Sequence, residues 1–420
     1  MRPRSTVWRR LSFAALCSYA VLGASACGAT PANRHGAAPA SRPAQAGPQA
    51  AAPAGSSCAQ AVAATLGEVA KRIYREASNG GDVEQAVHRL QSSSALASAV
   101  AAGNRAAATS VLRSLLLGQI ARVEVLRGGR VLASAGSGPA IAPVEGEVPG
   151  TAGRFVLSVQ PDRTYLQVAH QVTGAEVLLL SGSHATGTVS LPAGVAVPAS
   201  GPFSIGSQRY QVTSLTGSAY PSGSLRIALL VPSSQLSCPA EAAQTRTAVL
   251  GRVGERIYEE ELDSPTVRAT VRAMESDAAF KDAVATRDPT AVRRAIVGFF
   301  EAHIHVVRVR VTVGGKLLYD LGGPHVLAPV EGTLRQDGRV IGQFLMAIQD
   351  DAGYLKLARL FTGAQVLMRT AAGQVEGTLQ PGPASVPDRG SVSYGGRTYQ
   401  AYSFAATAFP SGRLQISLLF

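Results

Sequence analysis

The sequence predicts an α+β protein made of two tandem paralogous modules, each with N-terminal helices followed by a PAS-like antiparallel sheet. The first observation is a repeated motif, APVEGEV at residues 142–148 and APVEGTL at 328–334. The second is that helical periodicity precedes a Gly-Gly hairpin and alternating strands in both halves. The third is the length of 420 residues, which suits two or three domains that each bury a core.

The amino terminus has the pattern of a secretory signal. Residues 1–26 combine four arginines and no acid with an apolar run that is shorter than the ~20 residues of a transmembrane helix. Small residues lead directly into Cys27, so the segment resembles a bacterial lipoprotein signal, although Ala24 stands where such signals usually have Leu. Cys27 is therefore the predicted site of acylation, for example by palmitate. Ordinary secretion and a transmembrane anchor are the alternatives.

Residues 27–57 are predicted to form an Ala/Pro/Gly-rich tether, because they show no periodic apolar pattern. Such a flexible segment reaches on the order of 30 Å. No later stretch has transmembrane length, so we expect the modules to lie on the extracytoplasmic face of the cell membrane. We also expect no cytoplasmic output part, so that any signal would pass through a partner.

The duplication extends over two modules, 58–236 and 238–420. TLGEVAKRIYREA at 65–77 matches VLGRVGERIYEEE at 249–261, and the apolar positions recur on one helix face. The hairpins RVEVLRGGRVL and RVRVTVGGKLL also match. The separation between matched residues changes only from 184 to 189 along the chain, so the two copies share nearly every element.

The predicted elements follow the same order in each module: two or three helices, a long hairpin, a strand, a short helix and a meander of strands. Ser264-Pro265 and Asp288-Pro289 predict helix starts, because Ser or Asp caps free amides and Pro suits the first turn. Residues 307–313 predict a strand with valines on one face and Arg308 and Arg310 on the other. We expect one sheet per module, with the short helix laid across it.

Four segments of the second module carry a family resemblance: VRVRVTVGGKLLYDLGG, APVEGTL, GRVIGQFLMAIQDDAGYLKL and FPSGRLQISLLF. They resemble the Cache family, the PAS-like extracytoplasmic sensor domains of bacterial receptors. The resemblance implies a small-molecule pocket beside the sheet. Typical members lie between two membrane spans and feed a kinase, a methyl-accepting domain or a cyclase inside the cell.

The chain lacks the sequence motifs of several enzyme classes, so we expect neither enzymatic activity nor a cofactor. The motifs G-x-S-x-G, H-E-x-x-H, G-x-x-x-x-G-K-[ST] and C-x-x-C are absent. Asp350 and Asp351 form a paired carboxylate at a strand-to-helix junction. Capping of the helix N-terminus is the favoured interpretation of this pair.

The predicted ligand site lies in the second module, at the strand start 303–310 and the strand-to-helix junction 344–354. The predicted ligand-binding residues are His303, His305, Arg308, Arg310, Asp350, Asp351 and Tyr354. The matched positions of the first module are Leu117, Gln119, Arg122, Glu124, Asp162 and Tyr165. The first module is therefore expected to be a divergent or structural copy. Tyr354, matched by Tyr165, also suits a core aromatic residue.

His303 and His305 also suggest a metal, because they lie two residues apart and could be joined by His325 or Asp350. Lining of a ligand pocket and contact between imidazoles and helix carbonyl groups are the alternatives. We favour the alternatives and predict no metal site.

The net charge of +12 does not predict binding to nucleic acid, because no basic cluster with interleaved aromatic residues accompanies it. Weak attraction to anionic lipid or to an envelope polymer is the expected consequence.

Cys58 and Cys238 each precede the first helix of a module. An exported compartment permits a disulfide between them, and two free thiols are the alternative.

Two classes of function remain open. The first is a lipid-anchored Cache-type protein that binds or senses a small molecule of unknown identity. The second is an envelope lipoprotein that serves as a protein or cell-wall interaction scaffold. A pocket lined by polar side chains favours the first class, whereas apolar filling of both modules with an exposed patch between them favours the second.

Replacing Cys27 by Ser should move the protein out of the membrane fraction, because the acyl chain would have no attachment site. Cell fractionation followed by immunoblotting measures this change. Cys17→Ser, which alters a cysteine inside the apolar run, is the matched control and should stay with the membrane. A Cys27→Ser protein that also stays there would show that something else anchors it.

Overall fold

The computed structural model describes residues 54–116, 120–182, 184–192, 194–236, 242–303, 305–324 and 327–420. The predicted signal, the predicted tether up to residue 53 including Cys27, and Leu117, Gln119, Cys238 and His325 lie outside the described residues. The first helix begins at Ala54, so the last residues of the predicted tether belong to a helix. No helix among the described residues is long and apolar enough to cross a membrane.

The first module contains five α-helices and eleven strands within the described residues. The helices are α1 (Ala54–Asn79), α2 (Gly81–Gln91), α3 (Ser94–Ala101), α4 (Arg105–Leu115) and α5 (Asp162–Thr173). The strands are β1 (Arg122–Arg127), β2 (Arg130–Gly136), β3 (Ala140–Ile141), β4 (Val144–Val148), β5 (Gly153–Ser158), β6 (Gln160–Pro161), β7 (Glu176–Ser181), β8 (His184–Gly187), β9 (Gly201–Ile205), β10 (Gln208–Ser218) and β11 (Ser224–Pro232). A short 3₁₀ helix, η2 (Ser233–Gln235), follows.

The second module repeats this order among the described residues, without counterparts of β3 and β6. Its helices are α6 (Ala242–Asp263), α7 (Pro265–Ser276), α8 (Ala278–Ala285), α9 (Pro289–Ala302) and α10 (Asp351–Thr362). Its strands are β12 (Arg308–Val313), β13 (Lys316–Gly322), β14 (Val330–Gln336), β15 (Arg339–Ala347), β16 (Gln365–Thr370), β17 (Gly373–Gly377), β18 (Arg389–Tyr394), β19 (Arg397–Thr407) and β20 (Arg413–Leu419). The predicted helix starts are confirmed, since Ser264 and Asp288 accept hydrogen bonds from Val267 N and Thr290 N.

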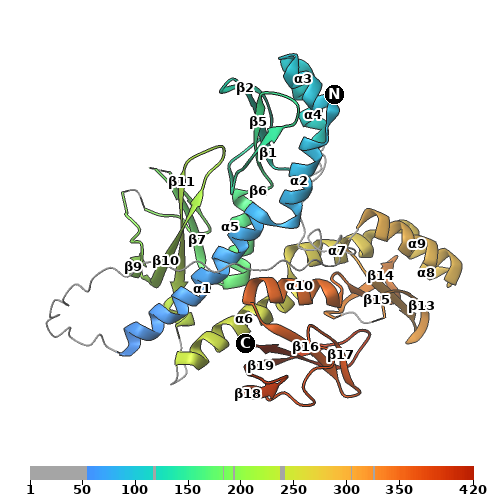
Figure 1. Ribbon diagram of the computed structural model, residues 1–420. Coiled ribbons are helices and arrows are strands. Elements are labelled where there is room, and N and C mark those ends of the chain that lie inside the picture. The colour runs from blue at the N-terminus through green and yellow to red at the C-terminus, as the bar shows by residue number, and fades with distance from the viewer. Residues whose placement is uncertain are drawn as a thin grey trace.

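The α+β class and the two repeated modules are confirmed, but each module has two large sheets where one was expected. In the first module the first sheet has the order β2-β1-β5-β4 and the second sheet has the order β8-β7-β11-β10-β9. The second module has the matching orders β13-β12-β15-β14 and β17-β16-β20-β19-β18. Figure 1 shows the two sheets of each module as separate bodies joined by α5 or α10. Four helices precede each first sheet, not two or three.

Different helices cover the two kinds of sheet. Buried residues of α7, α8 and α9 form one core with β12, β14 and β15, and the first module does the same with α2, α3 and α4. The second sheets bury one face against the long helices α1 and α6 and the short helices α5 and α10. These four helices share one continuous core across both modules, so the modules form a single packed unit (Figure 1).

The repeated APVEG motif lies where the first sheet meets the second in each module. Ala142 and Ala328 have left-handed φ values of 53° and 54° and are buried. Isolated bridges join the preceding residues to the hairpin of the second sheet, Ile141 to Ala219 and Leu327 to Ala408. The motif therefore holds the two sheets together, and this role explains why the chain contains it twice.

The glycine of the same motif makes room for an aromatic ring. A Cβ at Gly146 would overlap the ring of Phe155, and a Cβ at Gly332 would overlap the ring of Phe344. Phe344 in turn packs edge-on against Phe280, with ring centroids 6.4 Å apart. The motif thus connects the first sheet to the helices on its far side.

Ala328→Val should lower the free energy of unfolding by about 2–4 kcal/mol, because a β-branched side chain disfavours the left-handed conformation and overpacks a buried position. Ala405→Val is the matched control, since Ala405 lies exposed in β19, and its effect should stay within ~0.5 kcal/mol. Urea denaturation of both variants measures the difference. Equal stabilities would show that the left-handed alanine is not a constraint on the fold.

Candidate functional site

Arg308 and Arg310 lie on the face of the first sheet that points away from the helices. The intervening Val309 and the next residue Val311 are buried in the helix-side core. The guanidinium of Arg308 donates to both carboxylate oxygens of Asp320, at 2.9 and 2.8 Å. The predicted alternation of valine and arginine along this strand is therefore confirmed.

Arg308 also fixes the hairpin of the second sheet against the first sheet. Its guanidinium lies 4.3 Å from the ring centroid of Phe409, between β19 and β20, which is a cation–π contact. Its Nη1 also donates to the carbonyl oxygen of Pro324 at 3.1 Å. Arg308 is thus held by three partners and closes one end of the sheet face.

Arg310 is held less firmly than Arg308. Its Nη1 lies 3.8 Å from Asp320 Oδ2, an oxygen that already accepts from Arg308. The register places Arg310 beside Asp320 on one side and Leu345 on the other. Its side chain is 28% exposed.

The structure places the two histidines against the helices instead of beside the arginines. The His303 ring stacks on Phe299 at 4.0 Å between centroids, and its Nδ1 lies 3.2 Å from the Phe299 carbonyl oxygen. His305 Nε2 lies 2.9 Å from Thr270 Oγ1 of α7. Burial, and then the nearby His303, lower the pKa of His305. Contact with a helix carbonyl, one of the alternatives, is confirmed for His303.

No group of three or more His, Cys, Asp or Glu residues capable of holding a metal is found in the described part of the chain. His325, which was considered as a further ligand, lies outside that part.

The two aspartates at the start of α10 have different environments. Asp350 Oδ1 accepts from Gly353 N at 2.6 Å, so the expected helix cap is confirmed. Asp351 is only 7% exposed, and its carboxylate accepts a hydrogen bond from the backbone N–H of Leu327. Burial raises the pKa of Asp351 to about 7 against the opposing effect of that bond. Asp351 therefore titrates near neutral pH.

Gln349 is the residue that sequence reasoning missed. It lies between β15 and α10 and is only 3% exposed. Neither its Nε2 nor its Oε1 has a hydrogen-bond partner among the described residues. Buried polar groups are nearly always paired, and an unpaired one costs about 1–3 kcal/mol. The sequence signal was a polar residue at the end of the apolar run FLMAI, which Gln160 matches in the first module.

Tyr354 belongs to the core between α10 and α6. It is fully buried, and its hydroxyl donates to the Gly254 carbonyl oxygen at 2.9 Å. In the first module Tyr165 donates in the same way to Ala70 at 3.2 Å. The two tyrosines thus fix the short helix of each module to its long helix, as a core aromatic residue would.

The first module repeats part of this arrangement. The guanidinium of Arg122 lies 4.6 Å from the ring centroid of Tyr220, which corresponds to Phe409. The Oδ1 of Asp162, which opens α5 as Asp351 opens α10, is buried without a hydrogen-bond partner in the described residues. Burial raises the pKa of Asp162. The junction of both modules therefore contains an incompletely paired polar group.

No protein-family model matches the sequence, and no curated protein matches it. Among solved structures, the crystal structure of the periplasmic domain of LuxQ from Vibrio cholerae is similar to part of the chain. The TM-score is 0.30 and the sequence identity is 11%, over 42% of this chain and 99% of that chain. The functional proposal therefore depends on the residues of the site itself.

Asp351→Asn should remove a pH dependence of stability. A carboxyl group whose pKa is higher in the folded than in the unfolded state stabilises the fold below the unfolded pKa, and this stability is lost as the pH rises through about 7. Between pH 4 and pH 8 the wild type should therefore lose roughly 2–4 kcal/mol of unfolding free energy relative to Asp351→Asn.

Urea denaturation at several pH values measures this difference. Asp350→Asn is the matched control, because asparagine is as good an N-cap as aspartate. A pH-dependent change of the same size in Asp350→Asn would assign the effect to the helix terminus and not to the buried carboxyl group.

Proposed function

We propose that the protein is an extracytoplasmic small-molecule binding or sensing protein of the Cache type, whose ligand binds to the second module where β15 meets α10. The observation that carries this proposal is the pair of unpartnered amide atoms on buried Gln349. A bound solute would supply the missing partners and offset the cost of burying them.

The neighbouring groups support a polar ligand. Asp351, two residues beyond Gln349, is buried and has one backbone donor. Arg308, Arg310 and Asp320 line the face of the first sheet from which β15 leads to this junction. Gln349 offers one donor and one acceptor group, so a solute with an adjacent acceptor and donor fits it.

Attachment to the membrane through Cys27 is part of the same proposal, and its support is the signal-like amino terminus. A disulfide between Cys58 and Cys238 is a further part. Cys58 Sγ lies 3.7 Å from the carbonyl oxygen of Leu236, two residues before Cys238. Such a bridge would tie the start of α1 to the joint between the modules.

One observation favours the scaffold alternative. Leu317 and Val340 are exposed at the hairpin ends of the first sheet of the second module, and Val131 is exposed at the position matching Leu317. Apolar side chains at these hairpin ends could contact an envelope partner. Under this alternative Gln349 would have no ligand.

Gln349→Leu should have opposite effects on the free and the ligand-bound protein. The free protein should melt a few degrees higher, because an unpaired buried amide is replaced by an apolar side chain of similar size. The variant should also lose the rise in melting temperature that a ligand causes. A thermal-shift screen of amino acids, amides, amines and carboxylates on residues 57–420 measures both effects.

Gln343→Leu, on the exposed part of the same strand β15, is the matched control and should keep the ligand shift. A ligand that still shifts Gln349→Leu as much as the wild type would place the site elsewhere. A screen without any hit would favour the scaffold function.

A further inference from the structure

The two long helices reach across to the opposite module with equivalent arginines. Arg72 of α1 donates through Nη1 to the Phe361 carbonyl oxygen of α10 at 3.0 Å. Arg256 of α6, which aligns with Arg72 in the repeat, donates through Nη1 to the Thr173 carbonyl oxygen of α5. Each module therefore supplies a cation to the C-terminal end of the short helix of the other module, where helix carbonyl groups lack partners.

Both short helices end in the same Thr-Gly-Ala sequence, which shapes the receiving end. The threonine hydroxyl donates to the carbonyl four residues earlier at 2.5 Å, and the alanine N–H donates back to that hydroxyl. Gly174 and Gly363 are left-handed, with φ values of 68° and 77°. A Cβ at Gly174 would collide with the guanidinium of Arg256, and one at Gly363 would lie 3.0 Å from Arg72 Nη1.

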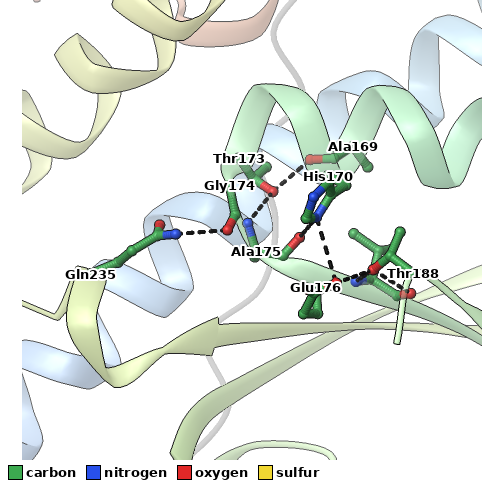
Figure 2. A network of polar contacts seen from close by, with 9 residues as sticks. Ala169, His170, Thr173, Gly174, Ala175, Glu176, Thr188 and Gln235 are labelled. Carbon is green, nitrogen blue, oxygen red and sulfur yellow. Dashed lines mark hydrogen bonds and ion pairs between the residues drawn. The ribbon is translucent and has the colours of Figure 1, made fainter. Parts of the chain in front are cut away.

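The end of α5 has further polar contacts (Figure 2). Gln235 donates through Nε2 to the Gly174 carbonyl oxygen at 2.7 Å, and its Oε1 accepts from Arg256 Nη2 at 3.0 Å. His170 Nδ1 lies 2.9 Å from the Ala175 carbonyl oxygen and 3.6 Å from Glu176 Oε2. The carbonyl oxygens of Ala169, Gly174 and Ala175 each have a polar partner at this turn (Figure 2).

The opposite ends of the same short helices contain the polar junction groups. Asp162 is the first residue of α5, and Asp351 is the first residue of α10. Each helix spans 12 residues, which is about 18 Å. Each short helix thus runs from the polar junction of its own module to an arginine of the other module.

We propose that the two modules form one intramolecular, pseudo-twofold unit in which α5 and α10 couple them crosswise. A change at the start of α10 shifts its C-terminal end against Arg72 and so reaches α1 of the first module. A change at the start of α5 reaches α6 of the second module through Arg256. This coupling goes beyond ligand binding, because it requires only that the short helices move as rigid bodies.

Hydrogen exchange of the full-length protein, followed by mass spectrometry, tests the coupling without a ligand. Arg72→Ala should speed amide exchange at residues 361–366 by about tenfold, because it removes a partly buried hydrogen bond at the helix end. It should also speed exchange at residues 173–177, which Arg72 does not touch, because loosening α1 against α6 weakens the Arg256 contact. Arg256→Ala should show the same pair of effects in reverse order.

Arg75→Ala is the matched control, since Arg75 is an exposed arginine one turn along α1, and it should leave both segments unchanged. Arg72→Lys keeps the charge and one donor and should restore part of the protection; it also serves if Arg72→Ala fails to fold. Faster exchange confined to residues 361–366 in Arg72→Ala, or equal effects of Arg75→Ala, would overturn the coupling.

Discussion

The left-handed alanine at the junction of the two sheets is the constraint on which the candidate site depends. Ala328 turns the chain between β13 and β14, and the preceding Leu327 makes two contacts there. Leu327 bridges to Ala408 of the second sheet, and its N–H donates to Asp351. A single backbone turn therefore fixes the relative position of the two sheets and the environment of the carboxyl group that opens α10.

The cation–π contact of Arg308 with Phe409 stabilises the same junction between the two sheets. A looser turn would let water reach Asp351, and the raised pKa of Asp351, which burial causes, would then fall toward its ordinary value.

Much of the fold could be predicted from local sequence patterns, because capping residues, Gly-Gly turns and alternating valines act over a few residues. The tandem duplication was also visible, since the two copies have nearly constant spacing. The number of sheets in each module could not be predicted from the sequence. β1 pairs with β5, and β11 pairs with β7, and such pairings between strands distant in the sequence leave no local signature. The sequence reads as one meander, and only the packing of α5 and α10 between the sheets separates it into two.

The candidate site was predicted only in part, because the sequence shows local patterns but not the contacts between distant residues. The alternation along β12 placed Arg308 and Arg310 on one face correctly. It could not show that Phe299 and Thr270 hold the two histidines on the helix side. Gln349 was not among the predicted ligand-binding residues, because its importance depends on the lack of hydrogen-bond partners for its amide among the described residues. A sequence does not show such a lack. A buried amide becomes significant only when its surroundings are known to offer no partner.

The covalent duplication has a consequence that two separate copies of one module would not have. Two identical subunits must present identical sides to a twofold interface, whereas two modules in one chain can diverge. Arg256 also donates to Gln235, whereas the hydrogen bond found for Arg72 among the described residues goes to Phe361. Glu261, which is buried near the end of α6 and has its pKa raised by burial to about 8, aligns with Ala77 of α1. The side-chain amide of Gln349 is buried without a partner among the described residues, whereas the matched Gln160 is only partly buried. The two modules thus share one apolar core, while the polar groups around it differ between the two halves. This division suits a protein in which one module binds a solute and the other receives the resulting change, because an asymmetric pair can respond in one direction.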